Sequence, residues 1–140
     1  MSDTTATTKR SLAWTVCGSR RDGMSEEEFR HYMTNVHAPL VREALARHGI
    51  TGYTMCFFDS TTKGLLDQVM GGQQFFTNET NYDIITQVRF PDVQCWINFQ
   101  NDPFYKEKVA PDHHRFTNPD RVFINIGWVE DFIIDGKIVA

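Results

Sequence analysis

Two amphipathic helical patterns, each flanked by segments with strand character, constrain the fold of this chain more than any other feature. The strand segments alternate apolar and smaller residues or are rich in β-branched and aromatic residues. They cover residues 12–17, 52–58, 82–90 and 121–132. One helical pattern lies between the first two strands and the other between the last two, so the sequence predicts the order β-α-β-β-α-β.

The first helix has the clearest start. Ser25 and Glu28 stand three residues apart before an apolar stripe, which is the spacing of a capping box. Pro39 lacks a backbone donor and disfavours helical geometry in the residue before it. We therefore expect a break or kink near His37, followed by a second helical stretch over residues 40–47.

The second half of the chain is punctuated in a similar way. Asp92 is expected to cap a helix, which Pro103 either stops or continues as a short helical piece through Lys108. Residues 111–119 are expected to form a connecting loop. Residues 135–136, Asp-Gly, are typical of a two-residue hairpin turn.

This order of elements is that of a ferredoxin-like α+β fold with a four-stranded antiparallel sheet. The 140 residues suit one domain, which we place at 11–140 after a flexible N-terminal tail at 1–10. The formal net charge of −4 provides no basic field for nucleic acid. No apolar run is long enough for a membrane helix, and the first residues lack the apolar core of a signal peptide, so a cytoplasmic location is expected.

The predicted strands place apolar side chains on both faces of the sheet, while two helices can cover only one face. Either loops of the same chain cover the second face, or a second copy does. We expect a homodimer whose two sheets enclose a mostly apolar cavity. Residues 59–81 show neither helical nor strand periodicity, and a loop of this length is expected to act as a lid or as a dimer-contact arm.

The sequence resembles the EthD-domain proteins of the dimeric α/β-barrel superfamily. The motifs that carry the resemblance are Gly23-Met24-Ser25-x-Glu27-Glu28-Phe29, His31-Tyr32, Val36-His37-Ala38-Pro39-Leu40, Tyr53, Tyr82-Asp83, Asp102-Pro103-x-Tyr105 and Pro111-Asp112-x-x-x-Phe116. The resemblance implies a lyase of fungal-type secondary metabolism that decarboxylates or dehydrates an aromatic polyketide intermediate, without metal or organic cofactor. A cofactor-free monooxygenase or cyclase, and a non-catalytic dimeric binding protein for a hydrophobic intermediate, are the alternatives.

His37 is the first candidate for the chemistry. An imidazole titrates near neutral pH and can move a proton in either direction, and a helix break beside Pro39 would turn it toward the cavity. The alternative is a structural histidine that packs at the kink. Tyr53 and Asp83 are the other catalytic candidates: Tyr53 would polarise a carbonyl or stabilise an enolate, and Asp83 would orient His37 or act as a base.

Six further residues are candidates for substrate binding. They are His31, Tyr32, Gln87, Tyr105, His113 and Asn125. The triplet Asp112-His113-His114 has the composition of a metal site, but adjacent ligands seldom converge on one ion and no further ligand has suitable spacing. No metal is therefore expected. The sequence leaves open which face of the sheet lines the cavity.

Overall fold

The computed structural model describes residues 10–71 and 78–140, and its centre is a single antiparallel sheet. The strands are β1 (Ser11–Gly18), β2 (Gly52–Phe57), β3 (Ile84–Phe90) and β4 (Phe123–Val129), in the order β2-β3-β1-β4. The predicted ferredoxin-like α+β fold is confirmed. Most of the predicted N-terminal tail, residues 1–9, lies outside the described residues.

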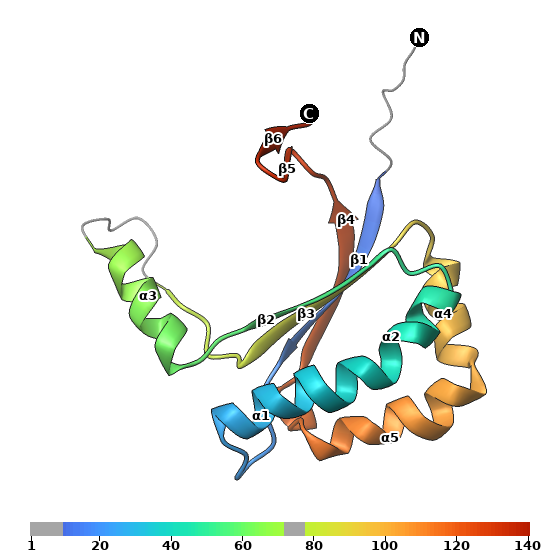
Figure 1. Cartoon of the computed structure of the whole chain (residues 1–140), viewed down its shortest axis with the longest axis horizontal. Helices are drawn as coiled ribbons and strands as arrows, with labels where there is room; N and C mark the ends of the chain where they lie inside the picture. Colours follow the sequence, from blue (N-terminus) through green and yellow to red (C-terminus); the bar gives the residue numbers. More distant parts are fainter. Residues whose placement is uncertain (1–9, 72–77) are drawn as a thin grey trace.

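Two helical segments, here called the first and second helical layers, cover one face of this sheet (Figure 1). The first runs through α1 (Glu26–Tyr32), a π-helical turn (Met33–His37) and α2 (Ala38–Arg47). The second runs through α4 (Val93–Asn101), a π-helical turn (Tyr105–Val109) and α5 (Ala110–Asp112), followed by 3-10 turns at His113–Arg115 and Pro119–Arg121. The prediction of a connecting loop at 111–119 is therefore wrong for its first half, which is helical. Pro111 stands at a helix start, where a residue without a backbone N–H loses no hydrogen bond.

The predicted helix caps are confirmed, and the predicted break near His37 takes an unexpected form. Ser25 accepts from the backbone N–H of Glu28 as a capping box requires, and Asp92 caps α4. Before Pro39 the helix continues through a wide turn, in which the N–H of Ala38 donates to the carbonyl of Met33. A π turn adds a residue to the helix and accommodates a proline that has no N–H to give.

Residues 60–70 form a helix, α3 (Ser60–Met70), which corrects the long loop expected at 59–81. Asp59 caps this helix through Thr62. Leu65, Leu66, Val69 and Met70 recur at helical spacing, but no α3 residue is buried. It projects from the body of the protein on the side of the sheet opposite the other helices (Figure 1). Residues 72–77 of the expected loop lie outside the described residues.

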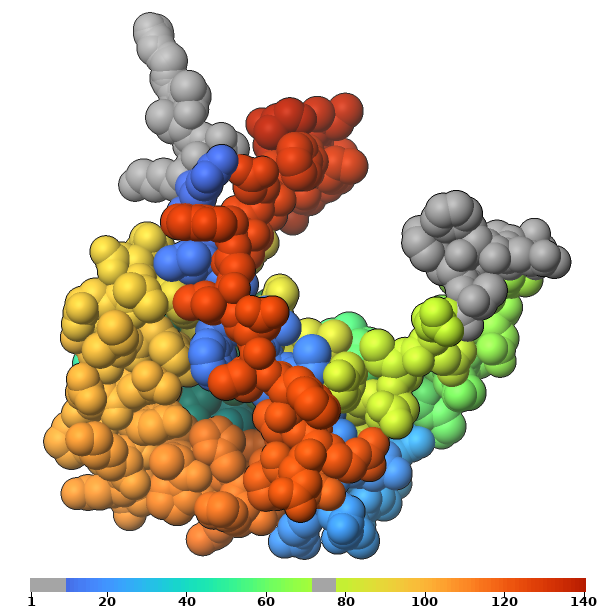
Figure 2. All heavy atoms as spheres, turned by 180° about the vertical axis from the view of Figure 1, so that it is seen from behind, coloured from blue at the N-terminus to red at the C-terminus, as the bar shows by residue number. Residues whose placement is uncertain are grey.

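The C-terminal segment forms the predicted hairpin. Strands β5 (Ile133–Ile134) and β6 (Lys137–Ile138) pair through a turn in which Asp135 and Gly136 both have positive φ. This is the backbone that a two-residue type I′ turn requires. Like α3, the hairpin leaves the body of the protein, and Figure 2 shows a hollow between the two projections.

The register of the sheet assigns the two faces. The side chains of Trp14, Val88 and Tyr53 share the helix-covered face, where β1, β2 and β3 meet the main core. On the opposite face, a polar row crosses all four strands and consists of Thr54, Gln87, Thr15 and Asn125. The expectation that both faces are substantially apolar is therefore wrong for the middle of the outer face.

Candidate active site

A cavity of about 450 Å³ lies between the sheet and the helices of one chain. This cavity is lined by the helix-covered face of the sheet and lies within one protomer. A cavity enclosed by the sheets of two copies stays a prediction. Half of its lining residues come from β1, β3, α2 and α4, and the rest come from β2, β4, the helical turns and the segments between them. The lining residues are Trp14, Val16, His37, Val41, Leu45, Tyr53, Thr86, Val88, Trp96, Phe99, Gln100, Tyr105, Val109, His113, Thr117, Pro119, Val122 and Ile124.

A buried carboxylate stands behind His37. Nδ1 of His37 lies 2.8 Å from Oδ2 of Asp112, and the hydroxyl of Tyr32 donates to Oδ1 of the same carboxylate. Both His37 and Asp112 are 6% exposed, so this polar pair is shielded from water. Because a carboxylate only accepts, Nδ1 of His37 is the protonated ring nitrogen, and Nε2 is left with a free lone pair.

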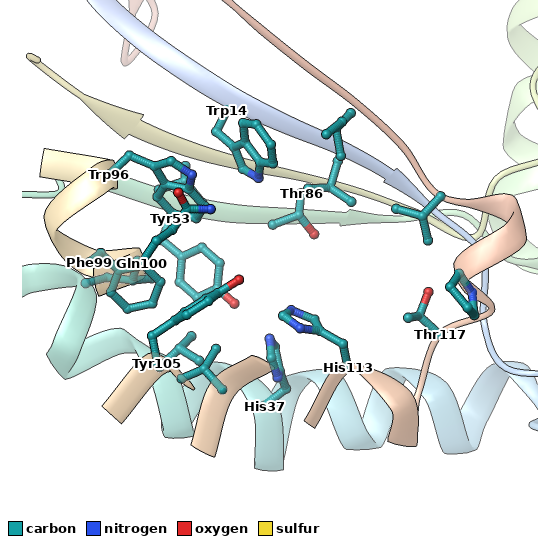
Figure 3. A pocket seen from close by; sticks show the side chains of 18 residues that line it. Trp14, His37, Tyr53, Thr86, Trp96, Phe99, Gln100, Tyr105, His113 and Thr117 are labelled. Atoms are coloured by element: carbon teal, nitrogen blue, oxygen red, sulfur yellow. The ribbon is translucent and has the colours of Figure 1, made fainter. Parts of the chain in front are cut away.

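The π turn and Phe116 set the orientation of the imidazole. His37 is the last residue of the turn that precedes Pro39, and the ring of Phe116 packs on it with centroids 4.6 Å apart. Figure 3 shows the His37 ring directed from the helix layer into the cavity. Burial lowers the pKa of His37 below its usual 6.5, although Asp112 acts in the opposite direction. The neutral, basic form is therefore the resting form near pH 7.

His113 adds a second imidazole beside the first. The two ring centroids are 5.4 Å apart, and Nδ1 of His113 is bonded to the carbonyl of Ala110 at 3.1 Å. Burial is the main cause that lowers the pKa of His113 below 6.5, and the neighbouring His37 lowers this pKa further. Each histidine thus has its Nδ1 engaged by the protein, which leaves both Nε2 atoms for a ligand.

Two phenols complete the polar part of the cavity. Tyr53 extends from β2 and Tyr105 from the second π turn, and both hydroxyls point toward the side that holds His37 and His113 (Figure 3). Burial alone raises the pKa of Tyr53. The hydroxyl of Tyr53 therefore stays protonated and is available as a hydrogen-bond donor to a ligand oxygen.

The structure thus brings together four of the residues selected from the sequence: His37, Tyr53, Tyr105 and His113. Tyr32 reaches the cluster indirectly, since its hydroxyl binds Asp112. Their roles in catalysis or binding stay predictions.

The other four predicted site residues do not line this cavity. Asp83 is bonded to Arg20, with Oδ1 3.1 Å from the guanidinium and Oδ2 2.8 Å from the backbone nitrogen, so it does not orient His37. His31 is exposed and is bonded to Asn35 on the next turn. Gln87 and Asn125 lie on the outer face of the sheet, where Gln87 donates to Thr15. A one-residue offset in a strand moves a side chain to the opposite face, which is why the sheet separates them from the cavity.

Asp112 is the site residue that the sequence analysis missed. The sequence places it in the motif Pro111-Asp112-x-x-x-Phe116 and in a metal-like triplet, within residues that were expected to form a loop. The Ala110-Pro111 pair before Asp112 repeats the Ala38-Pro39 pair after His37, and a π turn precedes both pairs. That repeated pattern is the signal that could have identified the second helical layer and Asp112.

The cavity wall carries no formal charge of its own in its resting state. Its lining includes no Lys, Arg, Asp or Glu, and both lining histidines are neutral near pH 7. In the part of the chain that the structure describes, no three His, Cys, Asp or Glu side chains gather in a way that could hold a metal ion. The oxygens of Asp112 are occupied by hydrogen-bond donors instead.

Comparison with known families assigns the chain. The profile of the EthD domain matches residues 21–120, a range that includes His37, Tyr53, Tyr105 and both members of the Asp112-His113 pair. The chain belongs to the EthD family. The resemblance inferred from the sequence is confirmed.

Several curated EthD-family relatives from fungi cover nearly the whole chain. The dehydratase ustZ of Ustilaginoidea virens is 36% identical over 90% of this chain and 89% of its own length. The decarboxylase claH of Passalora fulva is 37% identical over 93% of this chain and 83% of its own length. The conidial pigment biosynthesis dehydratase EthD of Metarhizium robertsii is 38% identical over 91% of this chain and 89% of its own length.

Solved structures share the fold at low sequence identity. An ethyl tert-butyl ether D family protein of Bacillus halodurans superposes with a TM-score of 0.57 at 14% identity, covering 84% of this chain and 96% of that chain. A dimeric protein of ferredoxin-like fold from Bacteroides fragilis gives 0.54 at 10% identity, covering 84% and 94%. The hydroxynitrile lyase of Passiflora edulis gives 0.55 at 8% identity, covering 90% and 99%. Within residues 10–71 and 78–140, every helix is too short or too polar to span a bilayer.

Proposed function

We propose that this EthD-family chain is a lyase of fungal secondary metabolism that dehydrates or decarboxylates an aromatic polyketide intermediate, with His37 as the general acid/base. The names of its curated relatives, dehydratase and decarboxylase, support a lyase-type enzyme. The single observation that carries the role of His37 is the buried hydrogen bond between its Nδ1 and Asp112.

That hydrogen bond makes Nε2 of His37 a competent base. Asp112 holds the tautomer with the proton on Nδ1, and its negative charge stabilises the imidazolium that forms when Nε2 takes a proton. Tyr32 donates to the other oxygen of the carboxylate and fixes its plane. Low exposure strengthens these interactions, because little water competes for them.

For a β-hydroxy ketone substrate, the arrangement supports dehydration. Nε2 of His37 removes the proton from the carbon beside the carbonyl, and the electron pair moves into an enolate whose oxygen accepts from the phenol of Tyr53 or Tyr105. The carbon–oxygen bond to the leaving hydroxyl then breaks as the imidazolium returns the proton to it. The products are a conjugated ketone and water, and His37 is regenerated.

For a β-keto acid, the same groups support decarboxylation. The bond to the carboxylate breaks, CO₂ leaves, and the electron pair forms an enolate that accepts a hydrogen bond from the phenols. The proton that Nε2 of His37 took from the carboxylic acid at the start is then delivered to the carbon, which restores neutral His37. Both reactions need only a base, an acid and hydrogen-bond donors, so we propose that neither uses a metal or an organic cofactor.

We also propose that the chain acts as a homodimer. The outer face of the sheet is uncovered in one protomer, and the structural relative from Bacteroides fragilis is described as dimeric. The surfaces beside that face expose apolar side chains, among them Leu65 and Val69 of α3 and Ile133 and Ile138 of the hairpin. A cytoplasmic location stays a prediction of the sequence.

The test is product analysis by mass spectrometry with candidate β-keto acids and β-hydroxy ketones of aromatic polyketides. Loss of CO₂ identifies decarboxylation, and loss of water identifies dehydration. We expect His37→Ala to lower kcat about 10²- to 10⁴-fold, the range of general acid–base catalysis. His31→Ala, on the same helical layer but exposed, is the matched control and should keep kcat.

Four outcomes would contradict the proposal. Incorporation of labelled O₂ would indicate a monooxygenase, and a product of unchanged mass would indicate a cyclase. Tight binding of a substrate that is recovered unchanged would indicate a binding protein. Full turnover by folded His37→Ala would remove His37 from the mechanism.

A further inference from the structure

The end of the cavity away from the two histidines is aromatic, and it carries polar groups that make no hydrogen bond within the part of the chain that the structure describes. Trp14 and Trp96 stack with ring centroids 5.5 Å apart, and Phe99 lies 5.3 Å from Trp96. Figure 3 places Trp96, Phe99 and Gln100 together at this end, whereas His37, His113 and Thr117 occupy the other. A ligand that fills the cavity therefore meets a hydrocarbon wall at one end and imidazoles at the other.

Gln100 is the adaptable polar side chain at the aromatic end. It lines the cavity, it is half-buried, and its amide makes no hydrogen bond to any described residue. Two other glutamines are bonded within the protein: Gln94 donates to Asn98 at 2.8 Å, and Gln87 donates to Thr15 at 3.2 Å. An amide with two donors and an acceptor is costly to leave unpaired at an apolar wall.

Trp96 supports the same conclusion independently. Its indole Nε1 is buried and has no hydrogen-bond partner among residues 10–71 and 78–140. Trp96 and Gln100 are four residues apart on α4, so their side chains lie on the same face of the helix. Buried polar atoms without partners are rare in native proteins and often mark a place where a ligand or water completes the bonding.

The volume sets the size of the occupant. A cavity of about 450 Å³ is three times the roughly 150 Å³ that holds one benzene in an apolar protein cavity. A planar ligand of about three fused rings would reach from the histidines to the aromatic end. Its distal ring would contact Trp14 and Trp96, and a substituent there would meet the amide of Gln100.

We propose that Gln100 is a specificity-determining residue, which binds an oxygen substituent on the ring of the substrate farthest from the reacting carbon. This inference rests on the proposed function for the direction of the substrate, with its reacting end at His37. The substrate class that it selects is a planar, multi-ring ketone or acid with a hydroxyl or carbonyl oxygen at each end. An analogue without the distal oxygen would leave the amide unpaired in an apolar wall, and it would bind more weakly.

The test measures binding of two probes that differ by one hydroxyl group. The probes are 2,6-dihydroxyanthraquinone, with a hydroxyl at each end, and 2-hydroxyanthraquinone, with one. Quenching of tryptophan fluorescence reports occupancy, because Trp14 and Trp96 both line the cavity. We expect the wild-type protein to bind the dihydroxy probe about 3- to 10-fold more tightly, the range for one net hydrogen bond.

Gln100→Met, which keeps the length of the side chain and removes the amide, should abolish that preference and bind the monohydroxy probe as well as the wild type does. Gln94→Met, on the exposed side of the same helix, is the matched control and should keep the preference. Gln100→Glu is a second variant if Gln100→Met does not fold, as judged by circular dichroism. It should keep affinity for a hydroxyl donor and lose affinity for 2,6-dimethoxyanthraquinone, whose oxygens only accept.

Equal weakening of both probes by Gln100→Met would overturn the inference, because it would indicate a role in shape alone. An unchanged preference would overturn it as well. Since these are binding measurements, they separate the two proposals. A chain that discriminates the probes through Gln100 but catalyses neither elimination nor decarboxylation would refute the proposed function and keep this inference.

Discussion

Nδ1 of His37 and Oδ2 of Asp112 lie 2.8 Å apart although 75 residues separate them in the chain. Each residue sits beside an Ala-Pro pair that follows a π-helical turn, one in each helical layer. The two residues join the two helical layers on the same face of the sheet. The contact between them is also the point where a buried charge meets the base of the proposed reaction.

Asp112→Asn tests this contact. The amide keeps the shape of the side chain but removes the negative charge that stabilises the His37 imidazolium, so we expect kcat to fall by at least about 10²-fold. Steady-state kinetics on candidate substrates provide the measurement. Asp120→Asn, which changes an exposed carboxylate in the turn Pro119–Arg121, is the control and should retain kcat. Equal activity of the two variants would show that Asp112 is only structural.

Stability should depend on pH through the two buried imidazoles. Burial lowers the pKa of His37 and of His113 below 6.5 in the folded protein. Between those lowered values and 6.5, the unfolded chain binds protons that the folded chain does not. The free energy of unfolding should therefore decrease as pH falls from 6.5 through this window, and these groups should add no slope well above 6.5.

Urea unfolding from pH 5 to 8 measures this dependence. His113→Gln removes one of the two groups, so its stability should decline less steeply with acidification than that of the wild type. An equally steep decline in the double variant His37→Gln/His113→Gln would assign the effect to other groups.

Tyr53→Phe should separate function from stability. The hydroxyl of Tyr53 has no hydrogen-bond partner among the described residues, so its removal should leave the free energy of unfolding unchanged or raise it by up to about 1 kcal/mol. The same change removes a donor to the enolate oxygen, and we expect kcat/KM to fall about 10- to 100-fold. Tyr82→Phe, outside the cavity, should leave kcat/KM unaltered. A destabilised Tyr53→Phe protein would mean that the hydroxyl is bonded within the fold.

Asp83→Asn tests the structural position of a carboxylate that the sequence suggested for catalysis. Asp83 binds both the backbone nitrogen and the guanidinium of Arg20 and is partly exposed. Loss of this partly solvated ion pair should lower the free energy of unfolding by about 1 kcal/mol, which for a domain of this size is a few degrees in Tm. Thermal unfolding at low and high salt provides the measurement, and an unchanged Tm in low salt would contradict it.

Local chemistry made most of the fold predictable. The capping box at Ser25, the cap at Asp92 and the hairpin turn at 135–136 depend on residues within three positions of each other, and all are confirmed. The helix α3 was not predicted, although Leu65, Leu66 and Val69 recur at helical spacing, because Gly64 and the glycines at 71 and 72 are typical of a loop. Residues 111–119 were misjudged because prolines at a helix start resemble prolines in a loop.

The site was only partly predictable, because its side chains come from elements that are far apart in the chain. His37, Tyr53, Tyr105 and His113 stood out as reactive side chains in or near predicted elements, and all four line one cavity. Asp83, Gln87 and Asn125 have equally suitable chemistry but belong to other surfaces. The partner of His37 could not be named from its neighbours in sequence, since Asp112 comes from the other helical layer.

By itself, the sequence determined the order of the four sheet strands and of the two helical segments that cover them, the ferredoxin-like class, the EthD family and the candidate His37 beside Pro39, because caps, periodicity and local motifs act over short stretches of chain. Tertiary structure alone decided that the cavity lies under the sheet in one protomer, and that Asp112 supports His37. It also decided that Gln100 faces the aromatic end. These relationships depend on the register of strands and on the packing of two helical layers, which join residues far apart in the chain.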